Sequence, residues 1–204
     1  MLKLINKEID LNKSRILFKE IITPDNFRYN FTTYNSKWTV EDGWITGRNP
    51  NETAGMAILN HDFPGNNLLD FEARTVLPST HDINFMWNGE WSDNLNSCGN
   101  AYVGSVCGWY TNRIGIEKSP DYKLIATTPH HNFEPGKIYR IQAGSIDGNC
   151  FIFIDGKLAI ELNDPDPLDT ARYTKVAFTA WSSCIRIRNI EIRQIEWKPL
   201  IMKY

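Results

Sequence analysis

Short runs in which apolar and polar residues alternate one by one follow each other along most of the chain. In one of these runs, Phe71 and Ala73 alternate with Glu72 and Arg74. Side chains of a β-strand point to opposite faces with period two, so this pattern predicts strands that bury one face. The predicted strands lie in the ranges 37–47, 55–60, 68–77, 81–91, 101–110, 113–118, 139–145, 150–162, 175–181 and 184–197.

Asp-Gly pairs separate several of these runs and predict tight hairpin turns at 42–43, 147–148 and 155–156. Helical candidates are confined to short pieces near 23–28 and 165–171. Roughly ten to fourteen short strands with turn signals between them predict an all-β fold of two antiparallel sheets packed face to face. Since no internal repeat or linker divides the chain, we expect residues 1–204 to form a single domain.

Composition narrows the classes of partner. The chain has 22 Lys and Arg against 24 Asp and Glu, which lacks the positive charge expected of a nucleic-acid-binding protein. No apolar run is long enough to span a membrane, and charges interrupt the start of the chain where a signal peptide would be apolar. The cysteines and histidines show no zinc-site spacing, and we expect reduced thiols in a cytoplasmic protein.

Four segments resemble the concanavalin A-like lectin/glucanase jelly roll over about residues 15–197: WTVEDGWITG, LLDFEARTVLPSTHDINFMW, YRIQAGSIDGNCFIFIDGKLAIEL and KVAFTAWSSCIRIRNIEIR. Within that superfamily, Lys118-Ser119 through Leu124 resembles a run of the YesU-like family of unknown function. The opening W-x-V-E-D-G hairpin is similar to that of the 3-keto-disaccharide hydrolases, which are more distant. The resemblance implies a β-sandwich that handles carbohydrate.

The resemblance supplies no catalytic residues. The glucanase signature E-x-D-x-x-E is absent, and INFMW stands where the 3-keto-disaccharide hydrolases have an N-S-G step. The resemblance as a whole still implies a protein acting on an oligosaccharide in bacterial polysaccharide use, as a glycoside hydrolase or a lyase. A non-catalytic carbohydrate-binding protein and a protein-interaction sandwich are the alternatives.

Strand parity places a set of polar side chains on the faces that point away from the core, and these are candidates for hydrogen bonds to sugar hydroxyls. Alternation does not tell which sheet each strand joins, and a solvated face with cross-strand ion pairs is the alternative. The candidates are Glu72, Arg74, Asn84, Asn88, Arg113, Glu117, Arg140 and Gln142.

Tryptophan is unusually frequent, with seven residues. A flat aromatic ring offers a sugar a large contact area at little entropic cost. Trp91, Trp109 and Tyr110 lie near loops and are the candidates for sugar stacking. The remaining strand tryptophans are expected in the core; they are Trp38, Trp44, Trp87 and Trp181.

Glycoside hydrolysis needs two carboxyl groups, and a lyase needs a base with a cation beside it. Glu72 and Glu117 are the candidate catalytic pair, although ordinary surface carboxylates are the alternative. Further candidate groups are Glu90, Asp93, His81 and Tyr110, with Arg74 or Arg140 as the cation. DPDPLD at 164–169 resembles an oxygen-rich loop that could hold a structural calcium ion, but it lacks EF-hand spacing. The pattern assigns no metal ligands and no oligomeric state.

Overall fold

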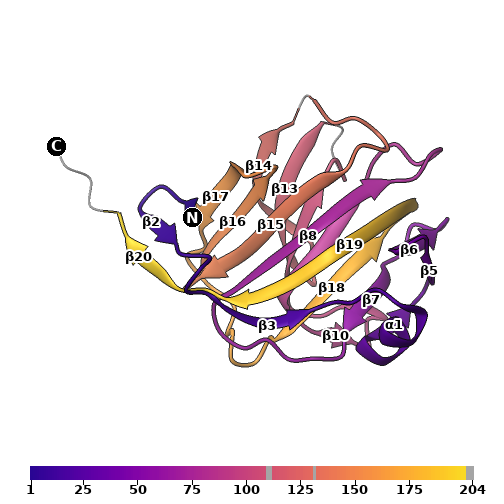
Figure 1. Ribbon diagram of the computed structural model, residues 1–204, viewed down its shortest axis with the longest axis horizontal. Helices are drawn as coiled ribbons and strands as arrows, with labels where there is room; N and C mark the ends of the chain where they lie inside the picture. The colour runs from indigo at the N-terminus through magenta and orange to yellow at the C-terminus, as the bar shows by residue number, and fades with distance from the viewer. Residues whose placement is uncertain (109–111, 131, 201–204) are drawn as a thin grey trace.

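Two antiparallel sheets packed face to face form the body of the protein (Figure 1). The computed structural model describes residues 1–108, 112–130 and 132–200. The seven-stranded sheet has the order β14-β13-β12-β9-β18-β7-β4 and the eight-stranded sheet the order β17-β16-β15-β8-β19-β6-β5, with β3 also paired to β19. The predicted all-β sandwich is confirmed.

The strands of the seven-stranded sheet are β4 (Phe31–Tyr34), β7 (Gly55–Leu59), β9 (Ile83–Gly89), β12 (Ala101–Val106), β13 (Arg113–Ser119), β14 (Lys123–Pro129) and β18 (Lys175–Ala180). Those of the eight-stranded sheet are β5 (Lys37–Glu41), β6 (Trp44–Asn49), β8 (Asn67–Thr75), β15 (Tyr139–Ile146), β16 (Asn149–Ile154), β17 (Lys157–Asn163) and β19 (Ser183–Gln194), joined by β3 (Arg15–Lys19).

Smaller elements cover parts of the two large sheets. A three-stranded sheet consists of β1 (Leu2–Lys3), β2 (Lys7–Ile9) and β20 (Trp197–Pro199), and a hairpin of β10 (Trp91–Ser92) and β11 (Ser97–Cys98). Helix α1 (Pro24–Asn30) begins after Thr23, whose hydroxyl accepts a hydrogen bond from the Asn26 amide at 3.1 Å. The predicted helix near 23–28 is therefore confirmed, whereas no helix lies at 165–171.

The Asp-Gly pairs form the predicted hairpin turns. Both residues of each pair have positive φ, for example 50° at Asp147 and 82° at Gly148. Such turns match the right-handed twist of the strands that they connect. The strands that the sequence pattern missed are β1 to β4, β11, β14 and all but the first residue of β20, which are short, pair at sheet edges or in the small sheets, or show little alternation in burial.

The main core lies between the two large sheets. Phe71 from the eight-stranded sheet contacts Phe85 and Phe178 from the seven-stranded sheet, with ring centroids 5.2 and 5.0 Å apart. Trp38 and Trp87 belong to this core, as expected from their strand positions. No helix of the described residues is long and apolar enough to cross a membrane.

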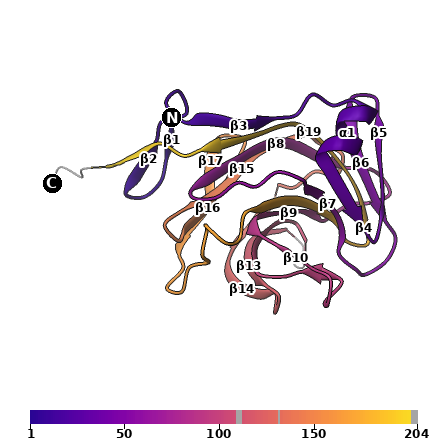
Figure 2. The same ribbon diagram turned by 90° about the horizontal axis from the view of Figure 1, so that it is seen from below.

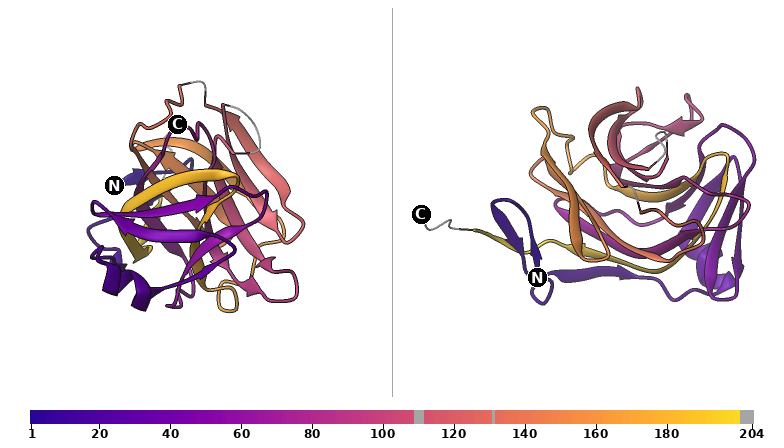
Figure 3. Two further views of the ribbon diagram at one scale, coloured as in Figure 1. Left: turned by 90° about the vertical axis from the view of Figure 1, so that its right-hand side faces the viewer. Right: turned by 90° about the horizontal axis from the view of Figure 1, so that it is seen from above.

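The outer faces of the two large sheets differ in shape and in charge. The seven-stranded sheet curls at its β13–β14 end, so that its outer face is hollowed (Figures 2 and 3). We call this the concave face. The outer face of the eight-stranded sheet carries most of the ion pairs of the strands, and we call it the charged face.

Candidate functional site

Four polar side chains from adjacent segments converge on the concave face. Asn84 on β9 is paired in register with Ser105 on β12, and Glu117 on β13 is paired with the neighbouring Val103. Asp82 lies just before β9. All four are buried, with exposed fractions of 5% or less for Asp82, Asn84, Ser105 and Glu117. We call these four residues the polar cluster.

Asp82 is held in an uncommon backbone conformation. Its φ is +79°, and its amide donates a hydrogen bond to the Cys107 carbonyl at 2.9 Å. The Asn84 side-chain amide donates to Asp82 Oδ1 at 2.7 Å. A non-glycine residue with positive φ costs free energy, and such residues gather at functional sites. The surrounding structure therefore fixes the direction of this carboxyl group.

One polar atom of each member of the polar cluster has no hydrogen-bond partner within the described part of the chain. These atoms are Asp82 Oδ2, Asn84 Oδ1, Ser105 Oγ and Glu117 Oε2. A buried polar atom without a partner costs about 1–3 kcal/mol, so four in one place need an explanation. A ligand or ordered water that supplies hydrogen bonds to all four atoms would remove that cost.

Burial raises the pKa values of both carboxyl groups. The pKa of Asp82 rises to about 7, although hydrogen bonds from Asn84 and the Trp181 backbone oppose the shift. The pKa of Glu117 rises to about 8, first because the group is desolvated and then because of the negative charge on Asp82. Two interacting carboxyl groups titrate as a pair. Near neutral pH this pair holds at least one proton and can supply an acid and a base together.

The polar cluster adjoins a cavity of about 370 Å³. Its lining residues are Glu52, His81, Asp82, Gly108, Trp181 and Ser182. Glu117 and Ser105 line a much smaller space on the other side of Gly108, next to Arg113 and Thr127. Trp181 is half-buried and offers an aromatic wall to the larger cavity.

Gly108 lies directly over the polar cluster. A Cβ atom at this position would stand 2.0 Å from Ser105 Oγ and 2.8 Å from Asp82 Oδ1. A side chain there would fill the space beside the two oxygen atoms. The absence of a side chain is therefore what lets the backbone approach the polar cluster so closely.

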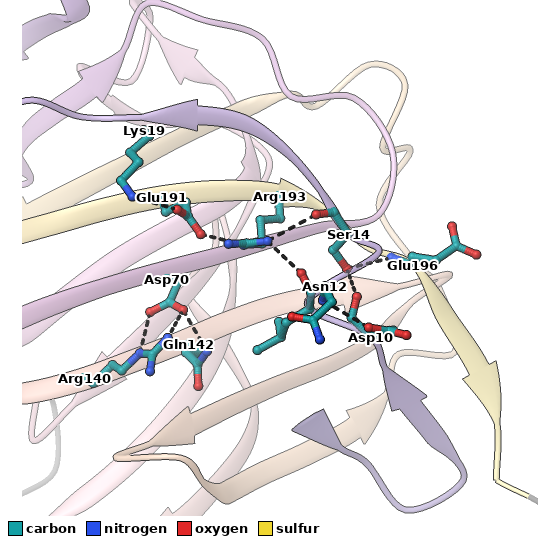
Figure 4. A network of polar contacts seen from close by, with 11 residues as sticks. Asp10, Asn12, Ser14, Lys19, Asp70, Arg140, Gln142, Glu191, Arg193 and Glu196 are labelled. Carbon is teal, nitrogen blue, oxygen red and sulfur yellow. Dashed lines mark hydrogen bonds and ion pairs between the residues drawn. The ribbon is translucent and has the colours of Figure 1, made fainter. Parts of the chain in front are cut away.

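The structure divides the predicted polar floor between two sheets, which corrects the expectation of a single groove. Asn84, Arg113 and Glu117 lie at the concave face. Arg140 and Gln142 lie on the charged face, where both donate hydrogen bonds to Asp70 (Figure 4). Strand parity was read correctly for these five residues, but parity carries no information about the sheet.

Glu72 and Glu117 are in different sheets and form no pair. Glu72 accepts a hydrogen bond from Arg188 Nε at 2.7 Å on the charged face. Arg74, on the same strand as Glu72, stacks over the ring of Trp44 at 4.9 Å, and Arg188 stacks over the same ring at 4.2 Å. Trp44 is thus buried under two guanidinium groups on an outer face, not in the core as expected.

Asn88 points into the sandwich rather than into the groove. Its φ of +43° breaks the alternation of β9, and the pairing of β9 with β18 shifts register in the same region. Its side-chain oxygen accepts a hydrogen bond from Ser145 Oγ at 2.6 Å on β15, and its side-chain amide donates to the Gly65 carbonyl at 3.3 Å. The irregular backbone therefore corrects the parity assignment at this residue.

The tryptophan assignments also change. Trp91 stacks on Tyr34 with ring centroids 3.9 Å apart and lines a separate hollow of about 310 Å³. Trp181, expected in the core, lines the cavity beside Asp82. The predicted sugar-stacking residues Trp109 and Tyr110 lie outside the described residues.

All three carboxylates of the candidate calcium loop have partners within the protein: Asp166 lies 3.6 Å from Lys118 Nζ, and Asp169 accepts a hydrogen bond from the Ala171 amide at 2.9 Å. Asp164 accepts a hydrogen bond from Tyr102 at 2.8 Å and forms an ion pair with Lys118 at 3.0 Å. Within residues 1–108, 112–130 and 132–200, no group of three or more His, Cys, Asp or Glu side chains is arranged to hold a metal ion. Calcium binding at this loop stays a prediction.

Asp82, Ser105 and Trp181 are the site residues that the sequence pattern missed. Ser105 and Trp181 lie in or next to predicted strands, but their polar or aromatic nature gives no sign of the face on which they lie. Asp82 lies in the predicted strand 81–91, but β9 begins only at Ile83 and Asp82 has a positive φ, so alternation does not apply to it. His81, named above as a candidate acid or base, does line the cavity.

Comparison with solved structures shows which known proteins share this fold. No model of a protein family matches the sequence, and no curated protein sequence is similar to it. The structure is similar to carbohydrate binding module CBM66 from Bacillus subtilis, with 13% identity over 80% of this chain and 95% of that chain and a TM-score of 0.66.

Two further solved structures extend the likeness. A protein of unknown function with a galectin-like fold from Bacillus subtilis has 12% identity, covers 89% of this chain and 96% of its own, and has a TM-score of 0.72. The exoplasmic/lumenal domain of VIP36, bound to Ca²⁺ and Man3GlcNAc, has 11% identity, covers 97% and 92%, and has a TM-score of 0.58. This chain therefore has the galectin-like, concanavalin A-like sandwich fold.

Proposed function

We propose that this protein binds an oligosaccharide at the concave face and cleaves it there by acid–base chemistry. The observation that carries the proposal is the pair of buried carboxyl groups, Asp82 and Glu117, each with one oxygen atom that lacks a hydrogen-bond partner among the described residues. Their raised pKa values leave one proton on the pair near neutral pH. Glycosidases use a protonated and an ionised carboxyl group in this way.

Asp82 is the group that contacts the substrate in this proposal. It lines the larger cavity, Asn84 holds its Oδ1 atom, and its Oδ2 atom is left for the substrate. A pKa of about 7 is close to the pH at which a general acid or base works best. Glu117 is the second carboxyl group, and its negative charge or proton sets the charge state of Asp82.

Binding would rest on the walls of the cavity. Trp181 in the cavity wall supplies an aromatic surface for the C–H face of a sugar ring. Asn84 and Ser105 do not line the cavity but belong to the adjoining polar cluster, where each has an atom available for a hydrogen bond to a hydroxyl group. Arg113 lies beside Glu117 and could neutralise the carboxylate of a uronic acid, which a lyase reaction requires. The products distinguish hydrolysis from elimination.

A non-catalytic role is the second candidate. The likeness in fold to a carbohydrate binding module supports it, since such modules bind sugars without changing them. In that role the polar cluster would only donate and accept hydrogen bonds. Membership of the YesU-like family, use in bacterial polysaccharide breakdown and residence in the cytoplasm stay predictions from the sequence.

The proposal is tested by screening the protein against a panel of plant polysaccharides and their oligosaccharides. The panel comprises rhamnogalacturonan, polygalacturonan, galactan, arabinan and xylan. Binding is measured on an array, and products are detected as new reducing ends or as the ultraviolet absorbance of an unsaturated product. We expect the wild-type protein to bind and cleave one of them. Glu117→Gln should bind the same glycan and release little product.

Two results would count against cleavage. Binding without product from the wild-type protein would favour the non-catalytic role. Unchanged product release by both Asp82→Asn and Glu117→Gln would show that the acid–base assignment is wrong. The control is Glu134→Gln, because Glu134 is an exposed carboxylate paired with Lys137 away from the cavity.

A further inference from the structure

The ionisable groups that line the larger cavity are mostly acidic. Of its six lining residues, Glu52 and Asp82 carry carboxyl groups and His81 carries an imidazole. No Lys or Arg is among the described residues that line it. Proteins bind a ligand carboxylate chiefly with guanidinium or ammonium groups, which supply both charge and hydrogen bonds. The lining therefore suits a neutral sugar and has the wrong sign of charge for a uronic acid.

Glu52 is exposed, but the loop that carries it is fixed to the cavity wall. The side-chain amide of Asn49, before this loop, donates a hydrogen bond to the Ala180 carbonyl at 2.9 Å, at the end of β18. The Ser182 amide donates to the Asn51 carbonyl at 3.0 Å, and Ser182 itself lines the cavity. These two bonds hold the loop against the segment that follows β18, so the Glu52 carboxylate stays at the cavity.

Asp82 adds a second carboxyl group, and its surroundings oppose any further negative charge. It is only 4% exposed, and its Oδ2 atom has no hydrogen-bond partner within the described part of the chain. Burial already raises its pKa to about 7. A ligand carboxylate beside it would raise that pKa further by like-charge repulsion, so binding such a ligand would cost free energy. A sugar hydroxyl instead donates a hydrogen bond to Oδ2 without adding charge.

Arg113 does not supply the missing positive charge to the larger cavity. Its side chain lines the smaller space, together with Glu117, and Gly108 is the residue that the two spaces share. A sugar unit that fills the larger cavity lies against the ring of Trp181 and the two carboxyl groups, and Arg113 is not part of that wall. The cation that elimination needs is therefore separated from this sugar unit.

We infer that the larger cavity takes a sugar unit without a carboxylate, and that the reaction at this site is hydrolysis rather than elimination. The inference rests on the proposed binding and cleavage of a glycan and narrows the substrate class to neutral sugars. Elimination removes the proton next to a uronate carboxylate and requires a cation where negative charge develops. Hydrolysis requires two carboxyl groups, which Asp82 and Glu117 supply.

The test compares short oligosaccharides that differ only in their carboxylates. Galactan and arabinan fragments are measured before and after oxidation of their primary hydroxyls to carboxylates. Fragments of glucuronoxylan, polygalacturonan and rhamnogalacturonan are measured before and after reduction of their carboxylates to hydroxyls. Calorimetry with Glu117→Gln gives the affinities, and array binding of the wild-type protein gives the same comparison if this variant does not fold. In each pair that binds, we expect the neutral member to bind at least about tenfold more tightly, because like charges a few ångströms apart repel.

Charge reversal at the cavity gives a second measurement. Glu52→Lys should reduce the advantage of the neutral member by about threefold or more, because repulsion of a ligand carboxylate is replaced by attraction. The control is Asp121→Lys, which changes the net charge by the same amount. Asp121 is exposed in the turn between β13 and β14, at the far end of β13 from Arg113. This control should keep the wild-type ratio of affinities.

Equal or tighter binding of the carboxylated members would overturn the inference and leave the proposed function intact. Release of an unsaturated uronic acid product would do the same, since it shows elimination. An unchanged ratio in Glu52→Lys would also contradict the inference, because the ligand would then lie away from Glu52. Absence of binding to every oligosaccharide would overturn the proposed function and this inference together.

Discussion

Carboxyl groups on the charged face and on the concave face have opposite environments. On the charged face, Glu41 accepts hydrogen bonds from Arg48 at 2.7 and 2.9 Å, and these bonds lower its pKa to about 2. Asp70 is bound by Arg140 through two hydrogen bonds. On the concave face, no cation is paired with Asp82 or Glu117 within the described ranges, and burial raises both pKa values.

The difference separates carboxylates that serve the structure from carboxyl groups available to a ligand. An ion-paired carboxylate has its hydrogen-bonding capacity used within the protein. A buried carboxyl group with a vacant oxygen atom keeps that capacity and tends to keep its proton. The concave face therefore has the groups for proton transfer, and the charged face does not.

The largest expected effect is on catalysis. Asp82→Asn should lower the rate of glycan cleavage by about 10²-fold or more, because a positioned general acid or base contributes about 10²–10⁴-fold. Glu72→Gln on the charged face should leave the rate within about twofold, the variation usual for a remote surface change. Initial rates on the glycan found in the panel measure both. A large loss in Glu72→Gln would show that the two faces do not divide in this way.

The second effect is on the pH dependence of stability. The ordinary pKa of Glu117 is 4.5 and its pKa in the folded protein is about 8. Between these values the unfolded chain has released this proton and the folded protein retains it, so rising pH favours unfolding. The slope from one such group reaches about 1.4 kcal/mol per pH unit.

Urea unfolding at several pH values between 5 and 8 measures this slope. We expect the free energy of unfolding of the wild-type protein to fall more steeply with pH than that of Glu117→Gln. Equal slopes in the two proteins would contradict the raised pKa of Glu117. Glu134→Gln is the matched control, since Glu134 is an exposed carboxylate.

The third expected effect is a loss of stability when an ion pair on the charged face is removed. Arg140→Ala removes both hydrogen bonds from the guanidinium group to Asp70, which is only 8% exposed, and leaves Gln142 as its partner. We expect a loss of about 1–2 kcal/mol in the free energy of unfolding, because Arg140 itself is half exposed to water. Arg28→Ala, which breaks an exposed pair with Asp25, should change stability little. Glycan binding should be unchanged in both.

The smallest expected effect is on glycan affinity, and it distinguishes two tryptophans. Trp181→Ala should weaken glycan binding by about 1 kcal/mol, or about fivefold, through the loss of an aromatic surface in the cavity. Trp44→Ala, under Arg74 and Arg188 on the charged face, should leave the affinity unchanged while lowering the melting temperature. Array binding and thermal unfolding distinguish the two. Equal losses of affinity would place the glycan elsewhere.

The sequence predicted the strands well where both alternation and a turn signal were present. The hairpin of β5 and β6 around Asp42 and Gly43 is an example. Its hydrophobic pattern also placed Trp38 and Trp87 in the core correctly. It failed at Asn88, because a single positive φ reverses the face of a side chain and leaves no mark in the alternation.

The candidate site was harder to predict from the sequence than the fold. Asn84 and Glu117 were named from parity, and the structure places both in the polar cluster. Asp82 was not named, because the predicted strand 81–91 begins two residues too early and hides the positive φ of this residue. Glu72 was named although it belongs to the other sheet. Pairing between strands far apart in the chain decides which polar side chains meet, and the pattern within a strand does not contain that information.

The sequence by itself determined most strands of the two large sheets, the Asp-Gly hairpin turns and the division of most strand residues into inward and outward faces, because these depend on neighbours along the chain. Only the tertiary structure decided which outward residues share a sheet, that Gly108 lies against Asp82 and Ser105, and that Cys98 packs on Met56 and Met86 at the concave face. Those properties depend on contacts between distant segments. Such contacts, not residue type, separate the two glutamates: burial raises the pKa of Glu117, and the hydrogen bonds from Arg48 lower the pKa of Glu41.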